Sequence, residues 1–129
     1  MTMFIKKEKV YEAAYSLIED FMDAFNEKST AKLKTEFGMT PAIYNEAREY
    51  LDDYFNTDQY LLKPPPKKGA SPHLLEDNLL DIYGTDEETD CWRINCRLFS
   101  EQGEEEISAN FDLFYDKEQF KLKYLYTAS

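Results

Sequence analysis

Hydrophobic residues in the first part of the chain recur with the period of a helix. Between Lys7 and Phe25 they recur at positions i, i+4, i+7, i+8, i+11 and i+15, a spacing typical of a helix with one buried face. The residues of this stripe are Val10, Ala14, Leu17, Ile18, Phe21 and Phe25. We therefore expect a first helix over Lys7 to Phe25, ending at Asn26 to Lys28.

Two shorter helices are predicted to follow. Ser29 is a suitable N-cap for a helix over Thr30 to Phe37, and Gly38 can end it in the left-handed conformation. Thr40-Pro41 is typical of an N-cap followed by proline at the first helical position. This third helix should run to about Phe55. We expect it to bury Ile43, Ala47, Tyr50, Leu51, Tyr54 and Phe55.

The C-terminal part alternates between apolar and polar residues, as strands do. Residues 91–101, 105–116 and 119–127 each predict a strand, and Leu79 to Tyr83 predicts an earlier one. The expected apolar face consists of Trp92, Ile94, Cys96 and Leu98, then Ile107, Ala109, Phe111, Leu113 and Tyr115, then Phe120, Leu122, Tyr124 and Tyr126. These strands predict an antiparallel β-meander over about 79–127.

Two turns bring the apolar positions into register. A turn at Gln102-Gly103 sets Leu98 opposite Ile107 and Ile94 opposite Phe111, and a turn at Lys117-Glu118 sets Phe111 opposite Tyr124. A slip of one residue would move a whole set into water, so the agreement supports this register. On the other face Arg93, Asp112 and Lys123 should lie side by side. Cross-strand pairing for stability is the simpler interpretation, and a substrate-orienting cluster is the alternative.

Residues 56–78 are predicted to form a loop. Tyr60 to Leu62 is a candidate short strand, whereas the prolines of Pro64-Pro65-Pro66-Lys67-Lys68-Gly69 exclude a helix and a central strand. The loop also holds the chain's one histidine, His73, which gives little support to nucleophilic catalysis. Cys91 and Cys96 should face opposite sides of the sheet, and their spacing fits neither a disulfide nor a metal site. We expect a protein that is not an enzyme and has no cofactor or metal.

Length and composition favour one compact unit. The 129 residues are 43% hydrophobic, enough for a core, and we expect a single α+β domain over 1–129. Two to three N-terminal helices would pack on a C-terminal antiparallel meander of three to four strands. No apolar run approaches the about 18 residues of a membrane span, and the start of the chain does not resemble a signal peptide. We therefore expect a cytoplasmic protein that does not bind membranes.

The net charge of −11 arises from the stretch between Glu76 and Glu118. Such a localised negative field attracts basic surfaces and repels nucleic acid. The predicted meander gathers most of these acids at its two ends. The denser end holds Asp86, Glu87, Glu88, Asp90, Asp116 and Glu118, and the other holds Glu101, Glu104, Glu105 and Glu106. The denser end is a candidate partner-binding site, although acidic loops also serve solubility.

The order of helices and strands resembles the NTF2-like and cystatin-like folds, in which a curved sheet wraps around an N-terminal helix. The small, acidic, cysteine-poor chain also resembles bacterial immunity proteins of contact-dependent and related toxin systems. That resemblance implies an inhibitor that binds a basic toxin domain, often a nuclease. The alternative function is an NTF2-like small-molecule-binding protein or enzyme, with a pocket between the helices and the side chains of Trp92, Phe111, Tyr124 and Tyr126.

Overall fold

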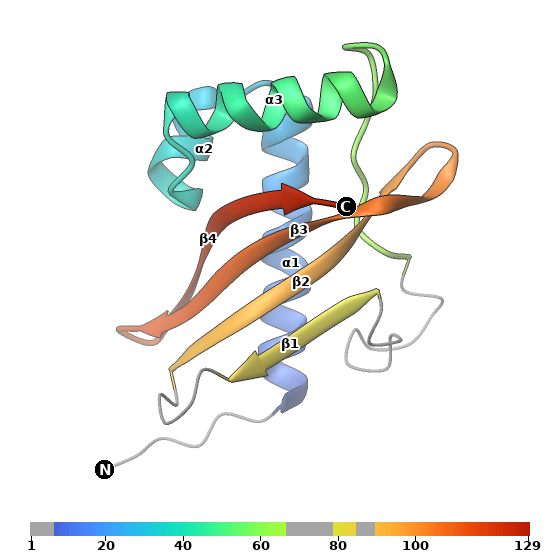
Figure 1. Ribbon diagram of the computed structural model, residues 1–129. Helices are drawn as coiled ribbons and strands as arrows, with labels where there is room; N and C mark the ends of the chain where they lie inside the picture. Colours follow the sequence, from blue (N-terminus) through green and yellow to red (C-terminus); the bar gives the residue numbers. More distant parts are fainter. Residues whose placement is uncertain (1–6, 67–78, 85–89) are drawn as a thin grey trace.

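The computed structural model describes residues 7–66, 79–84 and 90–129 and shows an α+β fold with three helices on a four-stranded antiparallel sheet. The helices are α1 (Lys7–Asn26), α2 (Thr30–Phe37) and α3 (Pro41–Phe55), and the strands are β1 (Leu80–Gly84), β2 (Cys91–Ser100), β3 (Gly103–Asp116) and β4 (Gln119–Ala128). Figure 1 shows α1 running behind the sheet, with α2 and α3 beyond its β4 edge. The predicted fold class is therefore confirmed. Asp86, Glu87, Glu88 and His73 lie outside the described residues.

The helix boundaries follow from local sequence signals. Gly38 ends α2 with a φ of 63°, and a Cβ at this position would lie 3.1 Å from Cγ of Lys123. Thr40 caps α3, because its hydroxyl accepts a hydrogen bond of 3.3 Å from the backbone N–H of Ile43. Ser29 occupies the predicted cap position of α2, but its side chain makes no capping hydrogen bond. All three predicted helices are confirmed.

The strands form a meander in the order β1-β2-β3-β4. Ile94 pairs with Phe111, and Phe111 with Tyr124, as the alternating pattern predicted. On the opposite face Arg93 pairs with Asp112, and Asp112 with Lys123. The register of both hairpins is thus confirmed over most of its length. The predicted earlier strand is also present, as β1 beside β2.

The turn between β2 and β3 corrects the prediction. It is formed by Glu101 and Gln102, because Ser100 pairs with Gly103, which follows the turn with a φ of 108° that favours glycine. A bulge in β3 absorbs the difference, since Arg97 still pairs with Ser108. Hydrogen bonds to the bulged residues compensate for the interrupted ladder. The backbone N–H of Glu106 donates to the Tyr54 hydroxyl (3.0 Å), and that hydroxyl donates to Oε1 of Glu105 (3.1 Å).

A second bulge, in β4, reverses the predicted direction of Tyr126. Phe111 pairs with Tyr124 but Asn110 pairs with Tyr126, so Leu125 is the extra residue of the strand. Each extra residue shifts the alternation by one. Tyr126 therefore lies on the outer face and is 52% exposed, not on the apolar face where its sequence spacing placed it.

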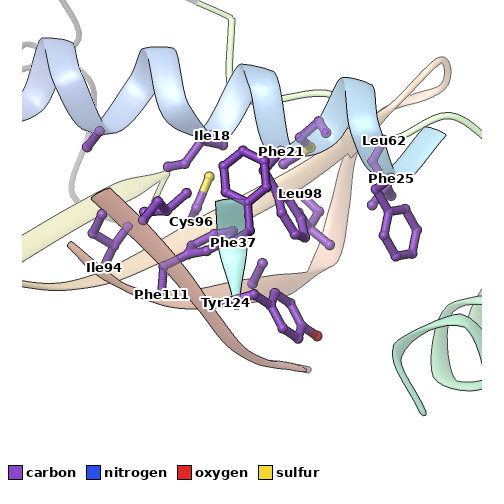
Figure 2. Close-up of a cluster of buried hydrophobic side chains, with 14 of the residues drawn as sticks. Ile18, Phe21, Phe25, Phe37, Leu62, Ile94, Cys96, Leu98, Phe111 and Tyr124 are labelled. Atoms are coloured by element: carbon purple, nitrogen blue, oxygen red, sulfur yellow. The ribbon is translucent and has the colours of Figure 1, made fainter. Parts of the chain in front are cut away.

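The core lies between α1 and the inner face of the sheet (Figure 2). Phe21 of α1 is central to it, with ring centroids 5.2 Å from Phe111 and 5.4 Å from Tyr124. Phe37 of α2 packs edge-on against Phe21 at 5.5 Å. In α3, Ala47 and Leu51 are buried as predicted, and Ile43 and Phe55 are partly buried. Tyr50 and Tyr54 are 37% and 38% exposed, so the prediction that α3 buries them was wrong.

The segment after α3 is tied to the core without forming the predicted short strand at Tyr60 to Leu62. Leu62 and Asn26 exchange two hydrogen bonds of 2.9 Å, and Lys63 makes an isolated bridge to Phe99. Arg48 joins this segment to α1. It donates to the backbone oxygen of Phe25 (2.6 Å) and to the hydroxyl of Tyr60 (3.2 Å). The guanidinium lies 4.0 Å from the centroid of the Phe25 ring, a cation–π contact.

Candidate functional site

Three of the six predicted site residues meet at one end of the sheet, which we call the acidic end (Asp90, Asp116 and Glu118). The backbone N–H of Tyr115 donates a 2.8 Å hydrogen bond to the backbone oxygen of Asp90, so Asp90 lies beside the β3–β4 turn. Glu118 belongs to that turn, and Asp116 precedes it. All three side chains are exposed, and they form no ion pair with any other described residue. Their charge is therefore available to a partner.

The β3–β4 turn presents these acids in a constrained backbone. Lys117 and Glu118 both adopt left-handed conformations, with φ of 51° and 63°. Two-residue hairpin turns of type I′ require this geometry, which asparagine and glycine adopt more readily than lysine or glutamate. The predicted turn at Lys117-Glu118 is confirmed as a tight one.

A shallow hollow of about 330 Å³ adjoins the acidic end. It is lined by Asp90, Phe114, Tyr115, Asp116 and Lys121. Phe114 is 36% exposed on the outer face, so an aromatic ring lies next to carboxylates there. Aromatic side chains beside charged groups are typical anchor points for protein partners.

The acids at the opposite end of the sheet are partly engaged within the fold. Oε2 of Glu104 lies 3.4 Å from Nε of Arg97. The carboxylate of Glu105 accepts hydrogen bonds from the hydroxyls of Ser100 (2.5 Å) and Tyr54 (3.1 Å). The contact with Tyr54 links the β2–β3 hairpin to α3, and the other two lie within the hairpin. The two acidic ends predicted from the sequence therefore differ: Glu104 and Glu105 have partners within the fold, whereas Glu101 and Glu106, like the three acids of the acidic end, form no ion pair with another described residue.

The polar cluster on the outer face is held by pairing across the strands. Nε of Arg93 donates to Oδ1 of Asp112 at 2.6 Å, and Nδ2 of Asn95 donates to Oδ1 of Asn110 at 3.0 Å. The hydrogen bond to Asp112 raises the pKa of Arg93 and keeps it charged. Tyr83, which is 51% exposed, extends this row across β1. The arrangement favours the structural interpretation of Arg93, Asp112 and Lys123.

A narrow cleft between α3 and β4 was not predicted as such. Its volume is about 220 Å³, and it is lined by Ile43, Glu46, Ala47, Tyr50, Tyr124, Leu125, Tyr126 and Thr127. Of the side chains suggested for a ligand pocket, Tyr124 and Tyr126 line it, whereas Phe111 is fully buried in the core. Trp92 is partly buried against Phe120, with ring centroids 6.0 Å apart. The bulge in β4 could not be deduced from the strand pattern, so the cleft between α3 and β4 could not be predicted.

The hydroxyls of Tyr124 and Thr127 lie 2.7 Å apart in this cleft. Burial raises the pKa of Tyr124, and the negative charge of Glu46 raises it further, so the phenol remains protonated at neutral pH. Burial also raises the pKa of the Cys96 thiol, to about 12, which excludes a reactive thiolate at that position. Within residues 7–66, 79–84 and 90–129, no three His, Cys, Asp or Glu side chains gather to hold a metal ion. No helix in that part of the chain is long and apolar enough to cross a membrane.

Comparison with known proteins assigns no relationship. No model of a known protein family matches the chain, and neither a curated protein nor a solved structure shows significant similarity to it. The resemblances to NTF2-like folds and to immunity proteins therefore stay predictions.

Proposed function

We propose that this protein is an inhibitor that binds and neutralises a basic protein, as an immunity protein does with a nuclease toxin domain. One observation carries the proposal: Asp90, Asp116 and Glu118 are exposed, free of ion pairs with other described residues, and next to the exposed ring of Phe114. Asp86, Glu87 and Glu88 come just before Asp90 in the sequence and would add to the same field. Such a surface is complementary to a basic partner.

Charge and aromatic contact would serve different steps of binding. Carboxylates that form no ion pair and that, with Asp86, Glu87 and Glu88, outnumber the nearby Lys117 and Lys121 would attract a basic surface over a distance and speed the encounter, an effect that salt screens. Phe114 and Tyr115 offer apolar area that the partner can cover once it has docked. Binding of this kind would occlude the toxin's own substrate-binding surface in the cytoplasm before the toxin can act.

Association kinetics with a candidate toxin test this proposal. The toxin is best chosen from a gene that lies next to the gene of this protein. The triple variant Asp90→Lys, Asp116→Lys, Glu118→Lys should associate more slowly by at least about tenfold, and the wild-type rate should fall with added salt. The matched control is Glu101→Lys, Glu104→Lys, Glu106→Lys at the other end of the sheet. It changes the net charge equally and leaves Glu105, which is hydrogen-bonded to Tyr54 and Ser100, in place.

The control variant should keep most of the association rate and should protect cells that express the toxin. An acidic-end variant that binds at the wild-type rate, with no dependence on salt, would overturn the proposal. Equal losses in the two triple variants would show that net charge alone acts, without a defined docking end.

The second candidate function is small-molecule binding, because Tyr124 and Tyr126 line the cleft between α3 and β4. The cleft's volume of about 220 Å³ lies below the range of about 300–1,000 Å³ that is usual for ligand pockets. This small volume argues against a metabolite in this cleft. Thermal-shift screening with small metabolites would separate the two, since an inhibitor of proteins should gain no stability from them.

A further inference from the structure

The cleft between α3 and β4 combines features that suit one kind of side chain. Its apolar wall is formed by Ile43 and Ala47 of α3, and Leu125 of the β4 bulge lines it too. The paired hydroxyls of Tyr124 and Thr127 are its fixed polar groups. Glu46, which is exposed, brings a carboxylate to the same space. The cleft therefore offers an apolar surface, hydroxyl oxygens and a negative charge within about 220 Å³.

No described lysine or arginine side chain balances the negative charge of Glu46 in the cleft. No lysine or arginine lines the cleft, and Glu46 makes no ion pair with another described side chain. Tyr50 is 37% exposed and supplies an aromatic side chain to the lining. Aromatic rings and carboxylates together attract cations that carry an apolar stem.

We propose that the α3–β4 cleft binds the cationic end of a lysine or arginine side chain that a basic protein partner inserts. Hydrocarbon groups of the inserted stem would lie against Ile43 and Ala47, and the cation would lie near Glu46 and the hydroxyls of Tyr124 and Thr127. The volume suits a single side chain better than a metabolite. That the cation comes from a protein partner rests on the proposed function. Cation binding in the cleft can be measured without that partner.

Titration of the ¹⁵N-labelled protein with n-butylammonium chloride tests cation binding directly. n-Butanol is the neutral probe of similar shape, and n-butylguanidinium is the arginine-like probe. We expect the cations to shift the amide signals of Ala47, Leu125 and Thr127 at millimolar concentrations, and n-butanol to shift them much less. Glu46→Gln should weaken this binding about three- to tenfold, because a charge-assisted hydrogen bond is lost.

Glu49→Gln is the matched control, since Glu49 is an exposed acid of the same helix that does not line the cleft. It should leave the affinity for n-butylammonium unchanged. The triple reversal at the acidic end should also leave the shifts in the cleft in place. Equal shifts with n-butanol, full binding by Glu46→Gln, or shifts confined to the acidic end would each overturn the proposal, and the last result would leave the proposed function standing.

The partner arm of the test uses the toxin complex. If a toxin side chain occupies the cleft, Glu46→Gln should raise the dissociation rate of the complex about three- to tenfold, and Glu49→Gln should not. A cleft that binds n-butylammonium but whose Glu46→Gln variant dissociates from the toxin at the wild-type rate would refute the partner side chain as occupant. If no toxin binds at all, the proposed function fails, while the result with n-butylammonium still decides whether the cleft takes a cation.

Discussion

The inner and outer faces of the sheet are made by the same strands, yet they are organised differently. On the inner face, Ile94, Phe111 and Tyr124 are at most 4% exposed and pack against α1. On the outer face, the paired row of Tyr83, Arg93, Asp112 and Lys123 is held by one ion pair and remains in contact with water. The comparison shows that packing against α1 specifies the register, while the outer face is free to carry charge.

The largest expected difference between the faces is in the cost of removing an aromatic ring. Phe111→Ala on the inner face and Phe21→Ala opposite it in α1 should each lower the free energy of unfolding by about 3–5 kcal/mol, as for other fully buried phenylalanines. Phe99→Ala, at a half-buried position of the outer face, should cost much less. Urea denaturation of the three variants measures these differences. Equal losses at all three positions would mean that the outer face is also covered, as in a dimer formed through the sheet.

Alkaline pH should lower the stability of the fold, because the thiol of Cys96 on the inner face is buried. Burial raises the pKa of this thiol from its ordinary 9.0 to about 12, so the folded state favours the neutral form. This contribution to stability is complete below pH 9 and is lost as the pH rises from 9 towards 12. By pH 10 the loss in the free energy of unfolding is about 1 kcal/mol. The measurement is the guanidinium unfolding midpoint as a function of pH.

Cys96→Ala should flatten this dependence, whereas Cys91→Ala, on the outer face, should retain it. Some dependence should remain in Cys96→Ala, because the pKa of Tyr15 is also raised, from 10.0 to about 12, mainly by burial. If the unfolding midpoint depends on pH in the same way in the wild type and in Cys96→Ala, burial of the Cys96 thiol does not cause the loss of stability.

On the outer face, the pairing of Arg93 and Asp112 should contribute modestly. A double-mutant cycle with Arg93→Ala and Asp112→Ala should give a coupling of about 0.5 kcal/mol, because the Arg93 side chain is 38% exposed and water screens the pair. The coupling should decrease in 1 M salt. A coupling above about 2 kcal/mol would show that this face is shielded from solvent by a partner.

The smallest expected effect on folding is at the acidic end. The triple variant Asp90→Lys, Asp116→Lys, Glu118→Lys should change the free energy of unfolding by no more than about 0.5 kcal/mol, because these exposed acids form no ion pairs with other described residues. Chemical denaturation checks this prediction, and the result also validates the binding experiment that uses the same variant. A loss of several kcal/mol would show that these carboxylates stabilise the β3–β4 hairpin.

The sequence predicted most of the inner face, because a slip of one residue between paired strands would move a whole set of apolar side chains into water. The match of Ile94 with Phe111 and of Phe111 with Tyr124 follows from this constraint. Helix ends were equally predictable, since Gly38, Thr40 and Pro41 carry local signals. The errors occur where tertiary contacts override the local pattern. Tyr54 was expected in the core, but its hydroxyl is used at the surface to satisfy the β3 bulge.

The candidate site was only partly predictable. The acidic end followed from the register, because pairing near Tyr115 brings Asp90 to the β3–β4 turn. The β4 bulge changes which face Tyr126 occupies and gives the α3–β4 cleft Leu125 as part of its lining. Tyr124, Leu125 and Tyr126 are all apolar, so the pattern there does not show which residue is the extra one. Only the pairing with Asn110 and Phe111 reveals it.

The packing of Phe21 between Phe111 and Tyr124 has a consequence for the order of folding. The β2–β3 and β3–β4 hairpins pair residues that are near in sequence, and such contacts form quickly. By contrast, α1 packs against strands that lie far from it in the sequence, and these contacts form more slowly. During synthesis, α1 leaves the ribosome before the strands, and its apolar stripe stays exposed until β4 has emerged. We therefore expect the nascent chain to be most prone to aggregation, and most dependent on chaperones, just before β4 is complete.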